Sequence, residues 1–249
     1  MSDSTAWQLF GATQAEQSAF GDFGTVFSLS GQVINHTPMS SLIRVEHENL
    51  GYYLKIYRTG GKGPRRYLGR SRLRAEFENA RYLAGCGVST LTVLGFGEYR
   101  NERFDRYGAL LTREAVGCRD MARIGRENPE LFQNPDLTRW LTERLAEEVR
   151  KMHAAGFVHG DLKWRNILVR FCRGRELYII DSPMGIRTTG SRFRRGVIKD
   201  LACLDKLGKV HLSRCQRLRF VLRYLGRPAL KSADKAWITR ILEFFRGRE

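Results

Sequence analysis

The segment between His159 and Asn166 contains the residue types that could do chemistry. Asp161 and Asn166 are five residues apart with Lys163 between them, and Asp181 follows 20 residues after Asp161. Phosphoryl transfer uses such a set. One carboxylate orients the attacking hydroxyl and accepts its proton, a second carboxylate and an amide oxygen hold Mg²⁺ against the nucleotide phosphates, and a cation offsets the transferred charge. A lone loop aspartate could instead cap a turn, but that alternative does not account for Asn166 and Asp181 together.

The elements around this segment would position it. A helix is predicted from Asp136, which can cap it, to about Ala155, because apolar residues recur on one face: Leu141, Leu145, Val149 and Met152. Strands are predicted at 167–171 and 177–180, joined as a hairpin. The candidate residues are therefore expected in a loop between a helix and a hairpin, with Asp181 directly after the second strand.

The rest of the chain predicts a strand-rich first part and a helix-rich second part, with a boundary near 114–117. Residues 1 to about 30 are expected to be a loosely ordered lead-in or a short strand. Basic loops are predicted at 59–66 and 188–195, and helices from about Val197 onward. The first part has predicted strands at 42–46, 52–57, 91–97 and 107–113, and a helix over 71–84.

Lys55 lies in the second of these strands, and Glu76 lies on the following helix. Glu76 shares a helix face with apolar residues, whereas Glu78 points elsewhere. A charged residue on an apolar stripe costs free energy unless it is paired. We therefore predict an ion pair between Lys55 and Glu76. The alternative for Lys55 is a solvated strand lysine.

Segment 159–166, with the sequence His-Gly-Asp-Leu-Lys-Trp-Arg-Asn, resembles the catalytic loop H-R-D-L-K-x-x-N of the protein-kinase-like superfamily. Asp181 begins Asp-Ser-Pro where that superfamily has D-F-G. The resemblance implies that Asp161 is the catalytic base, that Lys163 steadies the transferred phosphate, and that Asn166 and Asp181 bind Mg²⁺. Lys55 and Glu76 would form the nucleotide-binding ion pair.

The fold implied is α+β and bilobal. Its parts would be a lead-in (1–30), a strand-rich N-lobe that binds nucleotide (31–113) and a short helical C-lobe with the catalytic loop (114–249).

Three positions depart from the protein-kinase pattern. Gly160 stands where regulated protein kinases have an arginine that contacts a phosphorylated activation loop, which argues against phosphorylation-dependent activation. Pro183 fixes its own φ and lacks a donor, which argues against a flipping metal loop. No G-x-G-x-x-G precedes Lys55. The candidate for covering the nucleotide is the turn His36–Ser41, with its backbone N–H groups and the Ser40 and Ser41 hydroxyls.

Only 68 residues follow Asp181, fewer than eukaryotic protein kinases use for their substrate-binding helices. Asp200, in Lys-Asp-Leu, resembles the helix carboxylate that braces the catalytic loop in kinase-like folds. Together with the helix segment 76–80 and its ending 86–88, these features resemble the bacterial lipopolysaccharide kinase family, which includes heptose and Kdo (3-deoxy-D-manno-octulosonic acid) kinases. The resemblance covers residues 33–215. It implies ATP- and Mg²⁺-dependent phosphorylation of a sugar hydroxyl of the lipopolysaccharide inner core.

Composition sets the remaining expectations. The chain of 249 residues has a formal charge of +17, which suits a polyanionic partner. We expect an anionic glycolipid acceptor and peripheral contact with an anionic membrane. Nucleic acid is not expected, since no aromatic and basic recognition motif such as the RNP pattern is present. The basic residues proposed for these contacts, which could equally form a solvated face, are Lys62, Arg65, Arg66, Arg192, Arg194 and Arg195.

The five scattered cysteines and the lack of a signal-like start or a long apolar run favour a cytoplasmic protein. The resemblance to the lipopolysaccharide kinase family implies that it works at the inner face of the bacterial inner membrane. Trp164 is expected to pack in the protein interior rather than to stack on a sugar.

Two alternatives to the function of a lipopolysaccharide kinase remain. One is a kinase for protein or another small molecule, and the other is an inactive nucleotide-binding pseudokinase.

Overall fold

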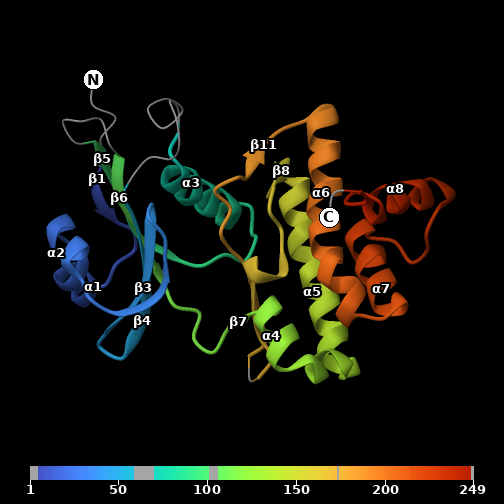
Figure 1. Ribbon diagram of the computed structural model, residues 1–249, viewed down its shortest axis with the longest axis horizontal. Coiled ribbons are helices and arrows are strands. Elements are labelled where there is room, and N and C mark those ends of the chain that lie inside the picture. Colours follow the sequence, from blue (N-terminus) through green and yellow to red (C-terminus); the bar gives the residue numbers. More distant parts are fainter. Residues whose placement is uncertain (1–4, 59–69, 101–105, 173, 248–249) are drawn as a thin grey trace. The chain divides into compact units, whose positions relative to one another are not determined.

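The computed structural model describes residues 5–58, 70–100, 106–172 and 174–247 (Figure 1). The chain forms two compact units. The first contains residues 1–81 and 91–116, and the second contains residues 82–90 and 117–249.

The first unit is built on a six-stranded antiparallel sheet in the order β1-β5-β6-β4-β3-β2. Between β3 and β4, Glu48 and Asn49 have φ values of 50° and 64°. Two residues with positive φ form the tight hairpin turn that matches strand twist. The strands are β1 (Thr5–Leu9), β2 (Gln32–His36), β3 (Ser40–His47), β4 (Leu50–Tyr57), β5 (Val93–Arg100) and β6 (Arg106–Arg113).

Alternation along β4 gives the sheet two different faces. Leu54 and Ile56 pack in one cluster with Phe20 and Val26, which come from α1 (Gln14–Phe20) and α2 (Phe23–Ser28). The opposite face packs against α3 (Arg72–Gly85) through Leu73, Phe96 and Leu110. Lys55 pairs with Leu110 in the register of β4 and β6, and Leu110 packs in the α3 cluster, so Lys55 lies on the α3 face of the sheet.

The short strand that was one of the two alternatives for residues 1–30 is present as β1, but the other alternative, a loosely ordered lead-in, is wrong, because the segment also supplies α1 and α2. The Trp7 ring packs on Gly95 and Gly97, where any side chain would collide with it. Its Nε1 donates to the Phe20 carbonyl at 2.7 Å. These contacts join residues that are far apart in the sequence, so the composition of the segment did not reveal them.

The second unit is mainly helical, with two small sheets ordered β10-β9-β7 and β11-β8. Its long helices are α5 (Pro135–Ala154) and α6 (Gly190–His211). The other elements are β7 (Arg119–Asp120), α4 (Met121–Glu127), η2 (Pro129–Gln133), β8 (Phe157–Val158), η3 (Trp164–Asn166), β9 (Ile167–Arg170), β10 (Glu176–Ile179), β11 (Ile186–Arg187), α7 (Arg214–Leu225) and α8 (Ser232–Leu242).

Two local predictions in this unit are wrong. The residue that caps α5 is Asn134, whose side chain accepts from the N–H groups of Asp136 and Leu137. The predicted basic loop 188–195 is helical from Gly190 onward, since arginine is a good helix former and no proline interrupts the segment. The apolar stripe predicted for α5 is confirmed and is buried.

None of the helices in the described ranges has the length and apolar character required to span a bilayer.

Candidate active site

The loop after β8 is held by a buried carboxylate from α6. Asp200 is fully buried. Its carboxylate oxygens accept from the backbone N–H of His159 at 2.7 Å and that of Gly160 at 2.8 Å. His153 of α5 lies 3.4 Å from the same carboxylate. The structure thus places Asp200 where the sequence predicted a brace for the loop.

His159 joins the loop to the end of β10. It is fully buried, and burial lowers its pKa below the usual value, against the attraction of Asp200. The neutral ring donates from Nε2 to the Ile180 carbonyl at 3.1 Å, and Nδ1 accepts from the Asp161 N–H at 3.3 Å. One tautomer satisfies both contacts, so the ring fixes the backbone on either side of the candidate base.

The glycine at position 160 has a local cause. Its φ is +79°, and an added Cβ would lie 3.1 Å from the Met184 carbonyl oxygen. A larger residue would be strained in this left-handed conformation.

Asp161 is paired with two cations. Its carboxylate lies 2.6 Å from Lys163 Nζ and 3.2 Å from an Arg165 nitrogen. Burial opposes ionisation, but the hydrogen bonds and charges of Lys163 and Arg165 outweigh it, so the pKa of Asp161 lies below its ordinary value. Arg165 was not among the site residues predicted from the sequence. Its position four residues after Asp161 was the available signal.

Asn166 and Asp181 lie on neighbouring pieces of backbone. The Asn166 carbonyl accepts from the Ile180 N–H at 3.0 Å, and Asp181 follows with a φ of 58°. The Asn166 Nδ2 donates to the Asp161 carbonyl at 2.8 Å, which leaves its amide oxygen to face away from that contact. An amide oxygen and a carboxylate carried on adjacent pieces of backbone suit Mg²⁺, which usually takes one or two carboxylates together with waters and substrate phosphates.

The first unit contains the predicted ion pair. Lys55 Nζ lies 2.7 and 2.9 Å from the two carboxylate oxygens of Glu76. Glu78 instead pairs with Arg70 at 3.0 Å. The geometry therefore supports the choice of Glu76 over Glu78.

The turn between β2 and β3 engages both of its serine hydroxyls internally. Ser41 Oγ lies 2.8 Å from His36 Nδ1, and Ser40 Oγ lies 3.2 Å from Thr37 Oγ1. A role for Ser40 and Ser41 at a nucleotide stays a prediction. The basic loop 59–66 lies outside the described residues.

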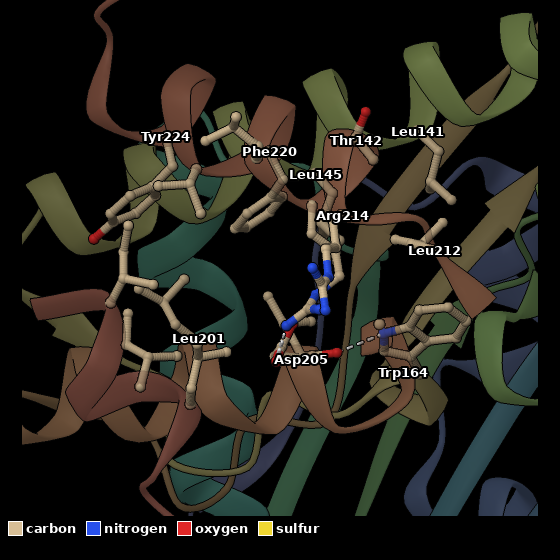
Figure 2. Close-up of a pocket in the computed structure, with 18 of the residues that line it drawn as sticks. Leu141, Thr142, Leu145, Trp164, Leu201, Asp205, Leu212, Arg214, Phe220 and Tyr224 are labelled. Atoms are coloured by element: carbon tan, nitrogen blue, oxygen red, sulfur yellow. Dashed lines mark hydrogen bonds and ion pairs between the residues drawn. The ribbon is translucent and has the colours of Figure 1, made fainter. Parts of the chain in front are cut away.

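Trp164 packs, as predicted. It is 2% exposed, its Nε1 donates to the Leu204 carbonyl at 2.9 Å, and its ring lies against Phe132. It also lines an apolar cavity of about 260 Å³ inside the second unit. Figure 2 shows this cavity, whose lining includes Leu141, Leu145, Leu201, Phe220, Tyr224, Trp237 and the ion pair Asp205–Arg217.

The chain is similar to known proteins in sequence and in fold. Residues 43–224 match the Lipopolysaccharide kinase (Kdo/WaaP) family. The chain is 28% identical over 218 residues to the lipopolysaccharide core heptose(I) kinase WaaP of Pseudomonas aeruginosa, which covers 83% of this chain and 81% of that protein. A solved structure described as WaaP in complex with acyl carrier protein is similar with a TM-score of 0.73 and 26% identity, covering 97% of this chain and all of that one. Fold, sequence and family match agree, and the chain therefore belongs to the lipopolysaccharide kinase (Kdo/WaaP) family of phosphotransferases.

Proposed function

We propose that this kinase transfers the γ-phosphate of ATP, with Mg²⁺, to a sugar hydroxyl of the lipopolysaccharide inner core. The observation that carries the proposal is the braced loop, in which Asp200 and His159 fix the backbone on both sides of Asp161. The relative named as a heptose kinase supports a saccharide acceptor. Such an acceptor is lipid-anchored, so we also propose peripheral contact with the inner membrane surface.

Asp161 would accept the hydrogen bond of the acceptor hydroxyl and take its proton as phosphorus is attacked. A carboxylate with a lowered pKa remains ionised at neutral pH, so it is ready for this role. Lys163, now 2.6 Å from Asp161, is close enough to turn toward the transferred phosphoryl group and offset its charge. The ion pair of Lys55 with Glu76 would orient the nucleotide phosphates.

Asn166 and Asp181 would hold Mg²⁺. The ion supplies charge neutralisation at the nucleotide phosphates when bound. Asn166 is suited to this because its Nδ2 is already engaged by the loop, which fixes the direction of the amide oxygen.

The test is transfer of labelled phosphate from ATP to purified acceptors: inner-core lipopolysaccharide whose accepting hydroxyl is unphosphorylated, free heptose, free Kdo and a generic protein. We expect transfer to the lipopolysaccharide, abolished by Asp161→Asn. Asp136→Asn, an exposed change at the start of α5, is the matched control and should retain activity. Transfer to protein alone, or equal turnover by Asp161→Asn, would contradict the proposal.

A second proposal concerns a partner. The similar structure is titled as a complex with acyl carrier protein, and this chain has an apolar cavity of about 260 Å³ in its helical unit. Apolar side chains offer an acyl chain an escape from water. We propose that acyl carrier protein binds this chain and that its acyl group enters the cavity.

Filling the cavity tests this partner. Val221 lines the cavity, whereas Val210 is 66% exposed on α6, so Val221→Trp and Val210→Trp form a matched pair. Thermal unfolding would first show that both variants are folded. Binding of acyl-loaded and unloaded carrier protein to the folded variants would then be measured by calorimetry. We expect Val221→Trp to weaken binding of the acyl-loaded form only. Equal binding of loaded and unloaded carrier by the wild type would refute a role for the cavity.

A further inference from the structure

The segment from Ser182 to Lys199, both included, contains five basic residues and no acidic residue. Three of them, Arg192, Arg194 and Arg195, are exposed on the first turns of α6. None of the residues that the structure describes forms an ion pair with these three arginines. This arginine cluster therefore presents its charge to solvent.

The arginine cluster has a fixed position relative to the catalytic loop. An added Cβ at Gly196 would lie 2.6 Å from the Val158 side chain, so α6 packs directly on the strand that enters the loop. Asp200 then binds the loop backbone itself. At a rise of 1.5 Å per residue, Arg195, the arginine of the cluster nearest to Asp200, lies about 8 Å from it along the helix axis. The arginines are thus carried by a rigid element clamped to the loop of Asp161.

The arrangement is unfavourable for the helix alone. The N-terminal end of a helix repels cations, and Arg192 and Arg195 are like charges three residues apart, which also repel. Other arginines of this unit have carboxylate partners, as in Arg217–Asp205 and Arg227–Asp234. An external anion would remove the repulsion at the cluster.

We propose that Arg192, Arg194 and Arg195 bind phosphate or carboxylate groups on the acceptor saccharide and thereby hold its hydroxyl at Asp161. This inference rests on the proposed function, and it adds the residues that recognise the acceptor. Guanidinium groups suit the task because their planar donors bind phosphate and carboxylate in pairs. The chemistry recognised is an anionic oligosaccharide rather than a neutral sugar.

The test replaces all three arginines with alanine and, separately, with lysine, which keeps the charge and loses the paired donors. The control removes the same charge elsewhere, through Arg126→Ala, Arg139→Ala and Arg240→Ala, three exposed positions. Binding of deacylated, phosphate-bearing inner-core oligosaccharide is measured without ATP by calorimetry, so the result does not depend on phosphoryl transfer. The KM values for acceptor and ATP are measured separately.

We expect the alanine variant to bind the oligosaccharide at least about tenfold more weakly, as loss of charge-assisted contacts implies. The KM for ATP and the unfolding temperature of the alanine variant should stay unchanged. The lysine variant should bind the oligosaccharide with an affinity between those of the wild type and the alanine variant. Unchanged oligosaccharide binding in the alanine variant would overturn the proposal. A defect seen only with full-length glycolipid in anionic micelles would also overturn it, since the arginines would then contact a lipid surface. Absence of phosphate transfer by the wild type would refute the proposed function and leave the binding result intact.

Discussion

Replacing Asp200 with asparagine removes the charge of the brace while preserving its shape. The carboxylate accepts two backbone hydrogen bonds, from His159 at 2.7 Å and Gly160 at 2.8 Å, and it is fully buried. An asparagine offers one acceptor oxygen, and its amide nitrogen would face a donor. One buried backbone N–H would therefore lose its partner.

The expected size follows from these contacts. A buried unsatisfied donor costs about 1–3 kcal/mol, and a hydrogen bond to a charged group contributes roughly 1.5–3 kcal/mol. We expect Asp200→Asn to lower the free energy of unfolding by about 3 kcal/mol. For a chain of this length, that corresponds to a fall in Tm of roughly 6–12 °C. The loop that carries Asp161 would also be held less firmly in position, so kcat should fall by a larger factor than the KM for ATP rises.

The fall in Tm is measured by thermal unfolding followed by circular dichroism, and the fall in kcat is measured by steady-state kinetics. Asp205→Asn is the control, because it removes another carboxylate from the same helix. The partner of Asp205 is Arg217, which lies 2.7 Å away and is partly exposed. It should cost no more than about 1 kcal/mol. If Asp200→Asn unfolded at the wild-type temperature and kept the wild-type kcat, the brace would have no such role and the reasoning would fail.

Three further predictions address other parts of the molecule. Glu76→Gln should raise the KM for ATP, measured in the transfer assay, because Lys55 would lose the charge that fixes it at 2.7 Å; an unchanged KM would contradict the pairing role. Gly160→Ala should destabilise the fold by about 1 kcal/mol, since φ is +79°, and equal denaturation midpoints would show that no strain arises. The hydrogen bond from Arg113, acting against burial, lowers the pKa of Glu16 from 4.5 to about 2. A depressed carboxyl pKa stabilises the fold above pH 4.5, and about 3 kcal/mol should be lost as pH falls toward 2. Glu16→Gln should flatten this acid limb in pH-dependent unfolding, and a limb unchanged in that variant would refute the assignment.

The sequence was most informative where chemistry requires fixed residue types at fixed spacing. The loop from His159 to Asn166 resembles a kinase catalytic loop in its residues alone, and the family match agrees with that interpretation. The ion pair of Lys55 with Glu76 was also predictable, since a glutamate on an apolar helix face needs a cation. These features are local, or they join two elements whose periodicity is strong.

Contacts between distant segments could not be predicted. Residues 1–30 looked loosely ordered because their apolar partners, such as Gly95 and Gly97 beneath Trp7, lie far along the chain. The start of α6 looked like a loop because its arginines suggested a solvated segment. Its packing on Val158 depends on the strand beneath Gly196.

The sequence by itself determined the candidate catalytic residues and the family, because phosphoryl transfer restricts both residue type and spacing. The tertiary structure alone decided how the loop is held, through His159 as a neutral ring and Gly160 in a left-handed conformation. It also revealed the cavity behind Trp164. Burial, backbone angles and side-chain neighbours arise only when separate segments pack together, so no spacing along the chain could specify them.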